Sequence, residues 1–198
     1  MARPRKFDEK KVLVLLTNIF WKNGYDGTTM DAILFATGLQ KGSLYSCFGN
    51  KEIIFKLALN HYAKDGPFYS LSDIKSPLKR LALFYETLIL GSKNPDKQRL
   101  GCFVFNSSLE FAGKKNLLAA FVDELGKKNE LFFHVLMREA KTTFEFSEKV
   151  SEKTAAERAH AAAFTIQEMS KFKSSRSFLA DIANSMFESI GAAQRVWA

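Results

Sequence analysis

Residues 24–55 read GYDGTTMDAILFATGLQKGSLYSCFGNKEIIF and decide the fold. The stretch holds two short helical patterns with Gly38 between them, and glycine permits the sharp turn that joins two such helices. A longer helix is expected before them over Asp8–Asn23, and Gly24 terminates it. The third helix, Lys41–Phe48, would then have the place and length of a helix that enters the major groove of DNA. The sequence therefore predicts a helix-turn-helix.

Helical patterns also fill the rest of the chain, and the alternating β-branched runs that indicate strands are missing. Asn50 can cap a connector helix, which Gly66 and Pro67 terminate. Capping boxes are expected at Thr28–Asp31 and Thr154–Glu157. The helices expected after the third are 51–64, 77–90, 103–111, 117–143, 154–172 and 177–195. The predicted fold is all-α. It has an N-terminal three-helix helix-turn-helix domain (1–50), joined by the connector helix to a C-terminal helical domain for ligand binding and dimerisation (51–198).

Composition is that of an ordinary folded protein. The hydrophobic share is 46% and the charged share 25%, which gives disorder no compositional basis. The net charge of +8 makes a polyanion such as DNA, RNA or an acidic membrane surface a plausible partner. The run Val12–Leu16 is too short for a signal peptide, and no stretch reaches the roughly 20 apolar residues that cross a bilayer. We therefore expect a cytoplasmic protein without a membrane partner.

Three positive charges, Arg3, Arg5 and Lys6, form a basic arm ahead of the first helix. Beside a DNA-binding motif, such an arm commonly adds phosphate or minor-groove contacts. A solvated terminus is the alternative, and the sequence leaves both open.

The N-terminal third of the chain also carries a family signature. Over about residues 10–60 it closely resembles the TetR family of repressors, while the remainder matches that family in being helical and of suitable length. The resemblance implies a sequence-specific repressor that binds palindromic operator DNA as a homodimer and is released by a small molecule. The residues that carry the resemblance are Phe20, Gly24, Tyr25, Thr29, Ile33, Gly38, Leu39, Lys41, Gly42, Ser43, Leu44, Tyr45, Phe48, Lys51, Glu52 and Phe55.

Four residues depart from the family pattern. Leu16 and Leu34 stand where alanine is usual, which predicts altered packing. Gln40 stands where serine or threonine would cap the third helix, which predicts a weaker cap. Cys47 stands where tyrosine or histidine is common, which predicts a different contact to DNA.

The residues predicted to bind DNA lie at the starts of the second, third and fourth helices. Lys41 can reach a guanine edge or a phosphate, and Gly42 lets the backbone approach the groove closely. Tyr45 can donate its hydroxyl to a phosphate, and the serines can meet base or backbone. The threonines and Lys51 can bind phosphate beside open helix N–H groups. A solvated helix face is the alternative for the lysines and the tyrosine. The predicted set is Thr28, Thr29, Lys41, Gly42, Ser43, Tyr45, Ser46 and Lys51.

The second domain is expected to sense a ligand, since many of the chain's 19 phenylalanines follow residue 60. An apolar cavity between helices could bind a hydrophobic effector. For any single ring, plain core packing is the alternative. The rings predicted to line the cavity are Phe84, Phe103, Phe105 and Phe121.

Cys102 is a candidate redox or electrophile sensor. It lies at the start of an expected helix, where the dipole, with Lys97 and Arg99 nearby in sequence, would favour the thiolate. The run 101–110, Gly-Cys followed by apolar residues and a glutamate, also looks like a subgroup of TetR-type regulators, some of which sense electrophiles through this cysteine. A small buried hydrophobe is the alternative. Cys47 and Cys102 form no CxxC pair, so no disulfide framework or zinc site is predicted.

The last two helices are expected to form the homodimer. The first has a small face and the second an apolar stripe, so the pair can build a four-helix interface with its copy. Packing of the same faces inside one chain is the alternative. The residues concerned are Ala155, Ala156, Ala159, Ala161, Ala162 and Ala163, followed by Phe178, Ile182, Met186, Phe187 and Ile190.

No catalytic constellation is visible. His61, His134 and His160 are dispersed, no glycine-rich phosphate loop occurs, and neither cysteine has a neighbouring histidine. We therefore predict no enzymatic function, no metal and no cofactor. An architectural DNA-binding protein would also be basic and helical, but it would not need so large an aromatic-rich second domain.

Overall fold

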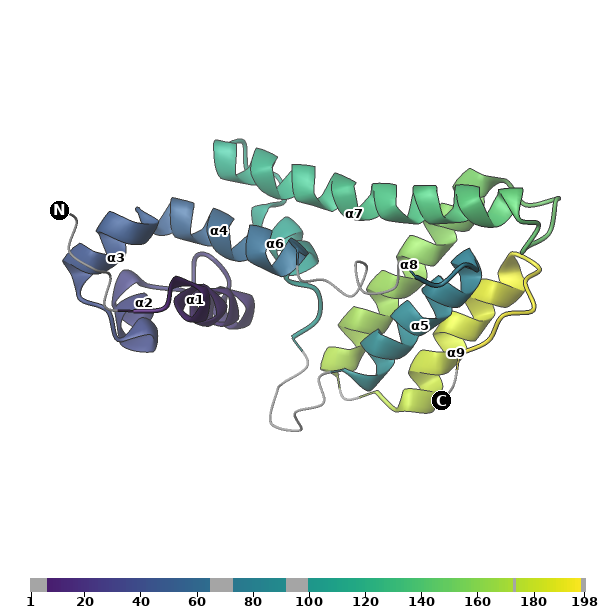
Figure 1. The fold of residues 1–198 in the computed structure, drawn as a ribbon, viewed down its shortest axis with the longest axis horizontal. Coiled ribbons are helices and arrows are strands. Elements are labelled where there is room, and N and C mark those ends of the chain that lie inside the picture. Colours follow the sequence, from purple (N-terminus) through teal and green to yellow (C-terminus); the bar gives the residue numbers. More distant parts are fainter. Residues whose placement is uncertain (1–6, 65–72, 92–99, 173, 197–198) are drawn as a thin grey trace. The chain divides into compact units, whose positions relative to one another are not determined.

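The chain is helical in the computed structural model, which describes residues 7–64, 73–91, 100–172 and 174–196 (Figure 1). Within these residues no strand occurs, and the all-α prediction is confirmed. None of the helices found there is long and apolar enough to span a bilayer. The helices are α1 (Glu9–Asn23), α2 (Met30–Thr37), α3 (Lys41–Phe48), α4 (Lys51–Lys64), α5 (Pro77–Leu90), α6 (Phe103–Phe111), α7 (Leu117–Thr142), α8 (Glu152–Lys171) and α9 (Arg176–Ser189).

Two of the expected helix starts are wrong. The cap of α2 is Thr29, whose hydroxyl oxygen accepts from the Ala32 N–H at 3.1 Å, and the cap of α8 is Ser151, which accepts from the Thr154 N–H at 3.0 Å. Thr29 and Ser151 have the extended backbone that a cap residue requires, so the helices begin just after them. Neither Thr28 nor Thr154 is therefore the cap.

The last helix is shorter than expected. α9 ends at Ser189 instead of continuing to residue 195. The chain closes the helix by a hydrogen bond from the Ala192 N–H to the Phe187 carbonyl at 3.0 Å, a pattern typical of helix C-termini. Ala193 and Arg195 suit a helix by residue type, but they follow the residue that makes this closing hydrogen bond.

Two compact units make up the chain. One consists of Met1–Asp65 and Phe103–Glu124, and the other of Gly66–Cys102 and Leu125–Ala198. The compact units are therefore not divided at residue 50, because α4 packs on α1 and α6 packs on α4. The expected division into DNA-binding and sensing parts concerns function and stays a prediction.

Aromatic rings fill the core of the first unit. Phe55 of α4 lies at the centre, with ring centroids 5.1 Å from Phe20 of α1 and 5.0 Å from Tyr25. Phe103 and Phe111 of α6 approach the same ring at 5.8 and 5.9 Å. α6 is thus part of the hydrophobic core that supports the first three helices.

In the second unit, α5, α8 and α9 pack against one another (Figure 1). The alanine face of α8 lies in this core, because Ala155, Ala156, Ala159, Ala162 and Ala163 are all buried. Small side chains allow close helix approach. The hydroxyl of the fully buried Tyr85 thus donates to the carbonyl of Ala159 at 2.8 Å, and burial raises the pKa of this tyrosine well above its usual value.

The predicted dimer faces therefore need correction. The five buried alanines pack within one chain, and so do Met186, Phe187 and Ile190 of the α9 stripe. Of the residues proposed for the interface, Ala161 and Phe178 remain exposed and Ile182 is half-buried. Spacing alone could not show which neighbour the small face would meet.

Candidate nucleic-acid interface

Gly38 makes the turn between α2 and α3. It has φ +67, the left-handed region that glycine enters without steric cost, and its N–H donates to the Leu34 carbonyl at 2.9 Å. The next helix lacks a side-chain cap, since Gln40 makes no capping hydrogen bond. The weaker cap predicted from Gln40 is confirmed. The turn and α3 have the local geometry of a helix-turn-helix.

The two sides of α3 differ completely in exposure. Leu44 and Phe48 are buried and attach the helix to the core of the first unit. The exposed side carries polar side chains and glycine, with the Tyr45 ring as its one large group. The predicted DNA contacts of this helix, all exposed, are Lys41, Gly42, Ser43, Tyr45 and Ser46. The five residues that the sequence predicted on this helix therefore all lie on its accessible face.

Gly42 has no packing partner on this face. Apart from its own stretch of helix, a Cβ built there meets no atom of the described residues within 4 Å, and the residue lies inside a helix, where alanine is preferred to glycine. The glycine is therefore not required by the packing of its own chain.

The two threonines before α2 lie in different environments. Thr28 is fully buried and its hydroxyl donates to the Gly24 carbonyl at 2.6 Å, so Thr28 cannot contact a phosphate and is removed from the predicted set. Thr29 is exposed. Its oxygen accepts from the Ala32 N–H, and its hydroxyl proton is then available for an outside acceptor.

The start of α4 is organised by Asn50 and Lys51. The Asn50 side chain accepts from the Ile53 N–H at 3.0 Å, as expected for a cap. Lys51 is half-buried, and its Nζ lies 4.4 Å from the centre of the Tyr25 ring. This cation–π contact attaches Lys51 to the turn between α1 and α2.

The rings predicted to form an effector cavity lie in different parts of the fold. Phe84 is buried in the second unit beside Phe133, with ring centroids 6.1 Å apart, whereas Phe103 and Phe121 belong to the first unit, as does Phe105. Phe103 packs on Phe55, and Phe121 lies under the Lys56 ammonium at 5.8 Å. The cavity lined by these four rings stays a prediction.

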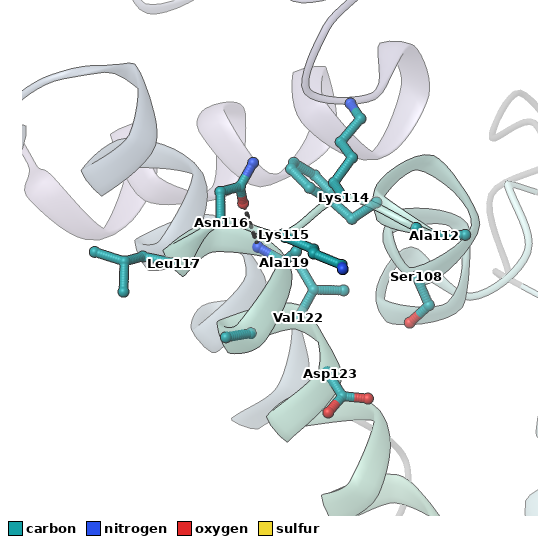
Figure 2. Close-up of a pocket in the computed structure, with 12 residues that line it drawn as sticks. Ser108, Ala112, Lys114, Lys115, Asn116, Leu117, Ala119, Val122 and Asp123 are labelled. Carbon is teal, nitrogen blue, oxygen red and sulfur yellow. Dashed lines mark hydrogen bonds between the residues drawn. The ribbon is translucent and has the colours of Figure 1, made fainter.

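A hollow of about 690 Å³ lies elsewhere, around the connection between α6 and α7 (Figure 2). Its wall combines apolar residues such as Val122 with the charged side chains of Lys114, Lys115 and Asp123. None of the four predicted rings lines this hollow.

Cys102 directly precedes α6, as the helical pattern predicted, and it is 7% exposed. The basic neighbours invoked for it, Lys97 and Arg99, lie outside the described residues, as do the arm residues Arg3, Arg5 and Lys6 and the expected helix end at Gly66–Pro67. In the described part of the chain, no three His, Cys, Asp or Glu side chains are placed to hold a metal ion.

Comparison with known proteins relates the N-terminal helices to a family of bacterial regulators. The sequence model described as bacterial regulatory proteins of the tetR family matches residues 13–58, which hold the turn and the exposed face of α3. Residues 13–58 therefore form an N-terminal domain of the TetR type. A curated relative in Escherichia coli (strain K12), the HTH-type transcriptional repressor ComR, is 29% identical over 110 residues, which is 54% of this chain and 52% of ComR.

Solved structures extend the likeness in fold over nearly the whole chain. A cysteine-substituted form of the regulator CifR, complexed with 26-bp operator DNA, has a TM-score of 0.77 at 23% identity, covering 93% of this chain and 98% of that one. AibR, in complex with isovaleryl coenzyme A and operator DNA, has a TM-score of 0.67 at 19% identity, covering 92% and 98%. The chain is a DNA-binding transcriptional regulator with a TetR-type N-terminal domain and the fold of these structures.

Proposed function

We propose that the chain is a repressor that binds a palindromic operator through the exposed face of α3 and leaves it when a small hydrophobic molecule binds. The observation that carries the proposal is this face. Lys41, Ser43, Tyr45 and Ser46 place donors and acceptors side by side, and Gly42 leaves room between them for DNA. Repression, as opposed to activation, is supported by the name of the E. coli relative ComR.

Each side chain of this face has a definite role in the proposal. Lys41, in the first turn of α3, reaches a guanine edge or a phosphate. Tyr45 donates its hydroxyl to a phosphate, and Ser43 and Ser46 meet bases or backbone. Thr29 adds a phosphate contact at the start of α2, and Lys51 adds positive charge beside the first N–H groups of α4.

A homodimer places two such faces on one duplex. Successive major grooves on one side of DNA are about 34–36 Å apart, so two α3 helices at that spacing, or somewhat more, read both halves of a palindrome. The outer faces of α8 and α9 are the surfaces available for it. They carry the exposed Ala161 and Phe178 with the half-buried Ile182, while the inner faces fill the chain's own core.

The effector proposal rests on the aromatic core of the second unit. Phe84 contacts Phe132 and Phe133 with ring centroids 6.3 and 6.1 Å apart, and His160 stacks on Phe133 at 5.0 Å. A rearrangement of such rings opens apolar space for a hydrophobic ligand. AibR, which shares the fold, was solved with an acyl coenzyme A. We propose a ligand that carries an apolar group such as a short acyl chain.

A covalent switch at Cys102 is the second candidate. The favouring observation is the position of this residue immediately before α6, where the helix dipole stabilises a thiolate. Its 7% exposure limits the access of reagents, which ranks a noncovalent effector above it.

The direct test uses the DNA immediately upstream of the gene for this chain. We expect the full-length protein to shift this fragment at nanomolar concentration and to release it when isovaleryl coenzyme A or another acyl thioester is added. Binding with no preference over unrelated DNA would contradict the operator proposal. Operator binding that persists with every apolar compound tried would contradict the effector part alone.

A further inference from the structure

The turn between α1 and α2 is held by a carboxylate that lies far from it in sequence. Glu110 of α6 accepts two backbone hydrogen bonds there, from the Tyr25 N–H to Oε2 at 2.9 Å and from the Asp26 N–H to Oε1 at 2.7 Å. Both oxygens of one carboxylate thus bind consecutive N–H groups just past the end of α1. Hydrogen bonds to an ionised acceptor are shorter and stronger than neutral ones.

Gly24 makes this approach possible. It has φ +73, and a Cβ built on it would lie 2.8 Å from Oε2 of Glu110, closer than real Cβ contacts. A side chain at residue 24 would therefore displace the carboxylate from the Tyr25 N–H. The glycine that ends α1 thus also leaves space for α6.

Two further contacts join α6 and the residues after it to the same turn. The Phe111 ring packs between Tyr25, at 5.6 Å, and Phe55, at 5.9 Å. Lys114 donates to Asp26 at 2.8 Å, and this hydrogen bond raises the pKa of the lysine and lowers that of the aspartate. Figure 2 shows Lys114 extending toward the neighbouring helices of the unit. Both charged groups are substantially exposed, so this ion pair contributes little.

The DNA-facing helices depend on this turn. Thr28 donates to the Gly24 carbonyl, Thr29 caps α2, and Lys51 of α4 lies over the Tyr25 ring. A shift of the turn therefore displaces Thr29 and the start of α2, and α3 follows α2 after a single tight turn.

We infer that Glu110 is a positioning residue for operator recognition, which acts through the backbone of Tyr25 and Asp26 to hold α2 and α3 in the orientation that binds DNA. The inference rests on the proposed function, because it requires that the face of α3 contact DNA. Glu110 itself does not touch the nucleic acid.

The experiment compares Glu110→Gln, Lys114→Met and Lys41→Ala with the wild type in the full-length protein. The probe is a fluorescent duplex that the wild-type chain selects from a random-sequence pool, titrated at several salt concentrations. Glutamine has the same shape but one acceptor oxygen, so its NH₂ group opposes one of the two N–H donors. We expect Glu110→Gln to lower operator affinity about 5- to 20-fold, which is typical of coupling between two separate sites. The slope of log K against log salt should not change, because Glu110 does not contact phosphate. Lys114→Met should stay within about twofold of wild type, as for an exposed ion pair.

A second readout tests the contact without DNA. Amide hydrogen exchange at Tyr25 and Asp26 should accelerate in Glu110→Gln, while the buried turns of α4 keep their protection. Should this variant fail to fold, Glu110→Asp, which keeps the charge but withdraws it by one methylene, is measured in the same way and should give the same changes in smaller degree.

Three results would overturn the inference. They are unchanged exchange at both amides, wild-type affinity in Glu110→Gln, and a changed salt slope, which would mean that Glu110 alters the number of phosphate contacts. The inference alone fails if Lys41→Ala binds poorly and Glu110→Gln binds normally. Wild-type affinity in both variants would instead refute the proposed function.

Discussion

Replacement of Gly42 by alanine should have opposite effects on stability and on DNA binding. Apart from its own stretch of helix, the added methyl group meets no atom of the described residues within 4 Å, so we expect no packing cost in the free protein. Alanine is preferred to glycine in a helix by about 0.5–1 kcal/mol, which raises Tm by roughly 1–4 °C for a chain of this size. On operator DNA the same methyl group fills the gap through which the backbone approaches the groove. Overpacking a close contact costs about 1–3 kcal/mol, or roughly 5- to 150-fold in Kd.

Thermal unfolding followed by circular dichroism and fluorescence anisotropy on the selected operator measure the two effects. Gly38→Ala is the matched control, because it also has open space around it but has φ +67, where alanine is strained, so its Tm should fall. A stabilised Gly42→Ala protein that binds operator as tightly as wild type would refute the close approach of DNA at this residue. A lower Tm would refute the helical environment on which the stability argument depends.

The other predictions concern the second unit and the cysteines. Phe178→Glu should convert the dimer to a monomer in sedimentation velocity with an unchanged helical spectrum, because it puts a charge on the outer face of α9; a persisting dimer would place the interface elsewhere. Burial, with the ring stacked on Phe133, lowers the pKa of His160 below its usual 6.5. The folded state therefore favours the neutral imidazole. The stabilisation that His160 gives to the folded state is complete above pH 6.5 and declines as the pH falls from 6.5 to the folded-state pKa. The free energy of unfolding, measured in urea, should fall less between pH 7 and pH 5 in His160→Gln than in wild type. Equal falls in the two proteins would refute the lowered pKa of His160. If the covalent switch operates, a quinone releases the operator from wild type and Cys47→Ser but not from Cys102→Ser, whereas equal release from all three would rule it out.

The parts of the fold that the sequence predicted correctly depend on local signals. The helix end at Gly24, the turn at Gly38 and the cap at Asn50 each follow from the conformational preference of one residue and its near neighbours. The exposed face of α3 follows from the spacing of Leu44 and Phe48 on a helix whose ends were known. Such signals are readable without knowledge of tertiary contacts.

The features of the fold and the site that the sequence did not predict depend on which helix surfaces contact each other in the folded chain. The alanines of α8 indicated a close helix contact, but the sequence could not show that Ala159 would meet Tyr85 of its own chain. Thr28 and Thr29 differ in burial because one of them points into the unit, which their shared chemistry does not reveal. Glu110 was noted as the end of a motif, yet its partners lie 84 and 85 residues away, beyond any local signal.

The most direct test of the account is the operator affinity of the double variant Lys41→Ala/Tyr45→Phe. Both side chains lie on the exposed face of α3, so their removal should leave Tm unchanged. Loss of a guanine or phosphate contact by Lys41 alone is expected to cost about 1–3 kcal/mol, and a lost phosphate contact lowers the slope of log K against log salt by about one. We predict a double variant that folds normally and binds the operator at least about fivefold more weakly. A double variant that binds with wild-type affinity and salt dependence would contradict the assignment of α3 as the helix that reads DNA.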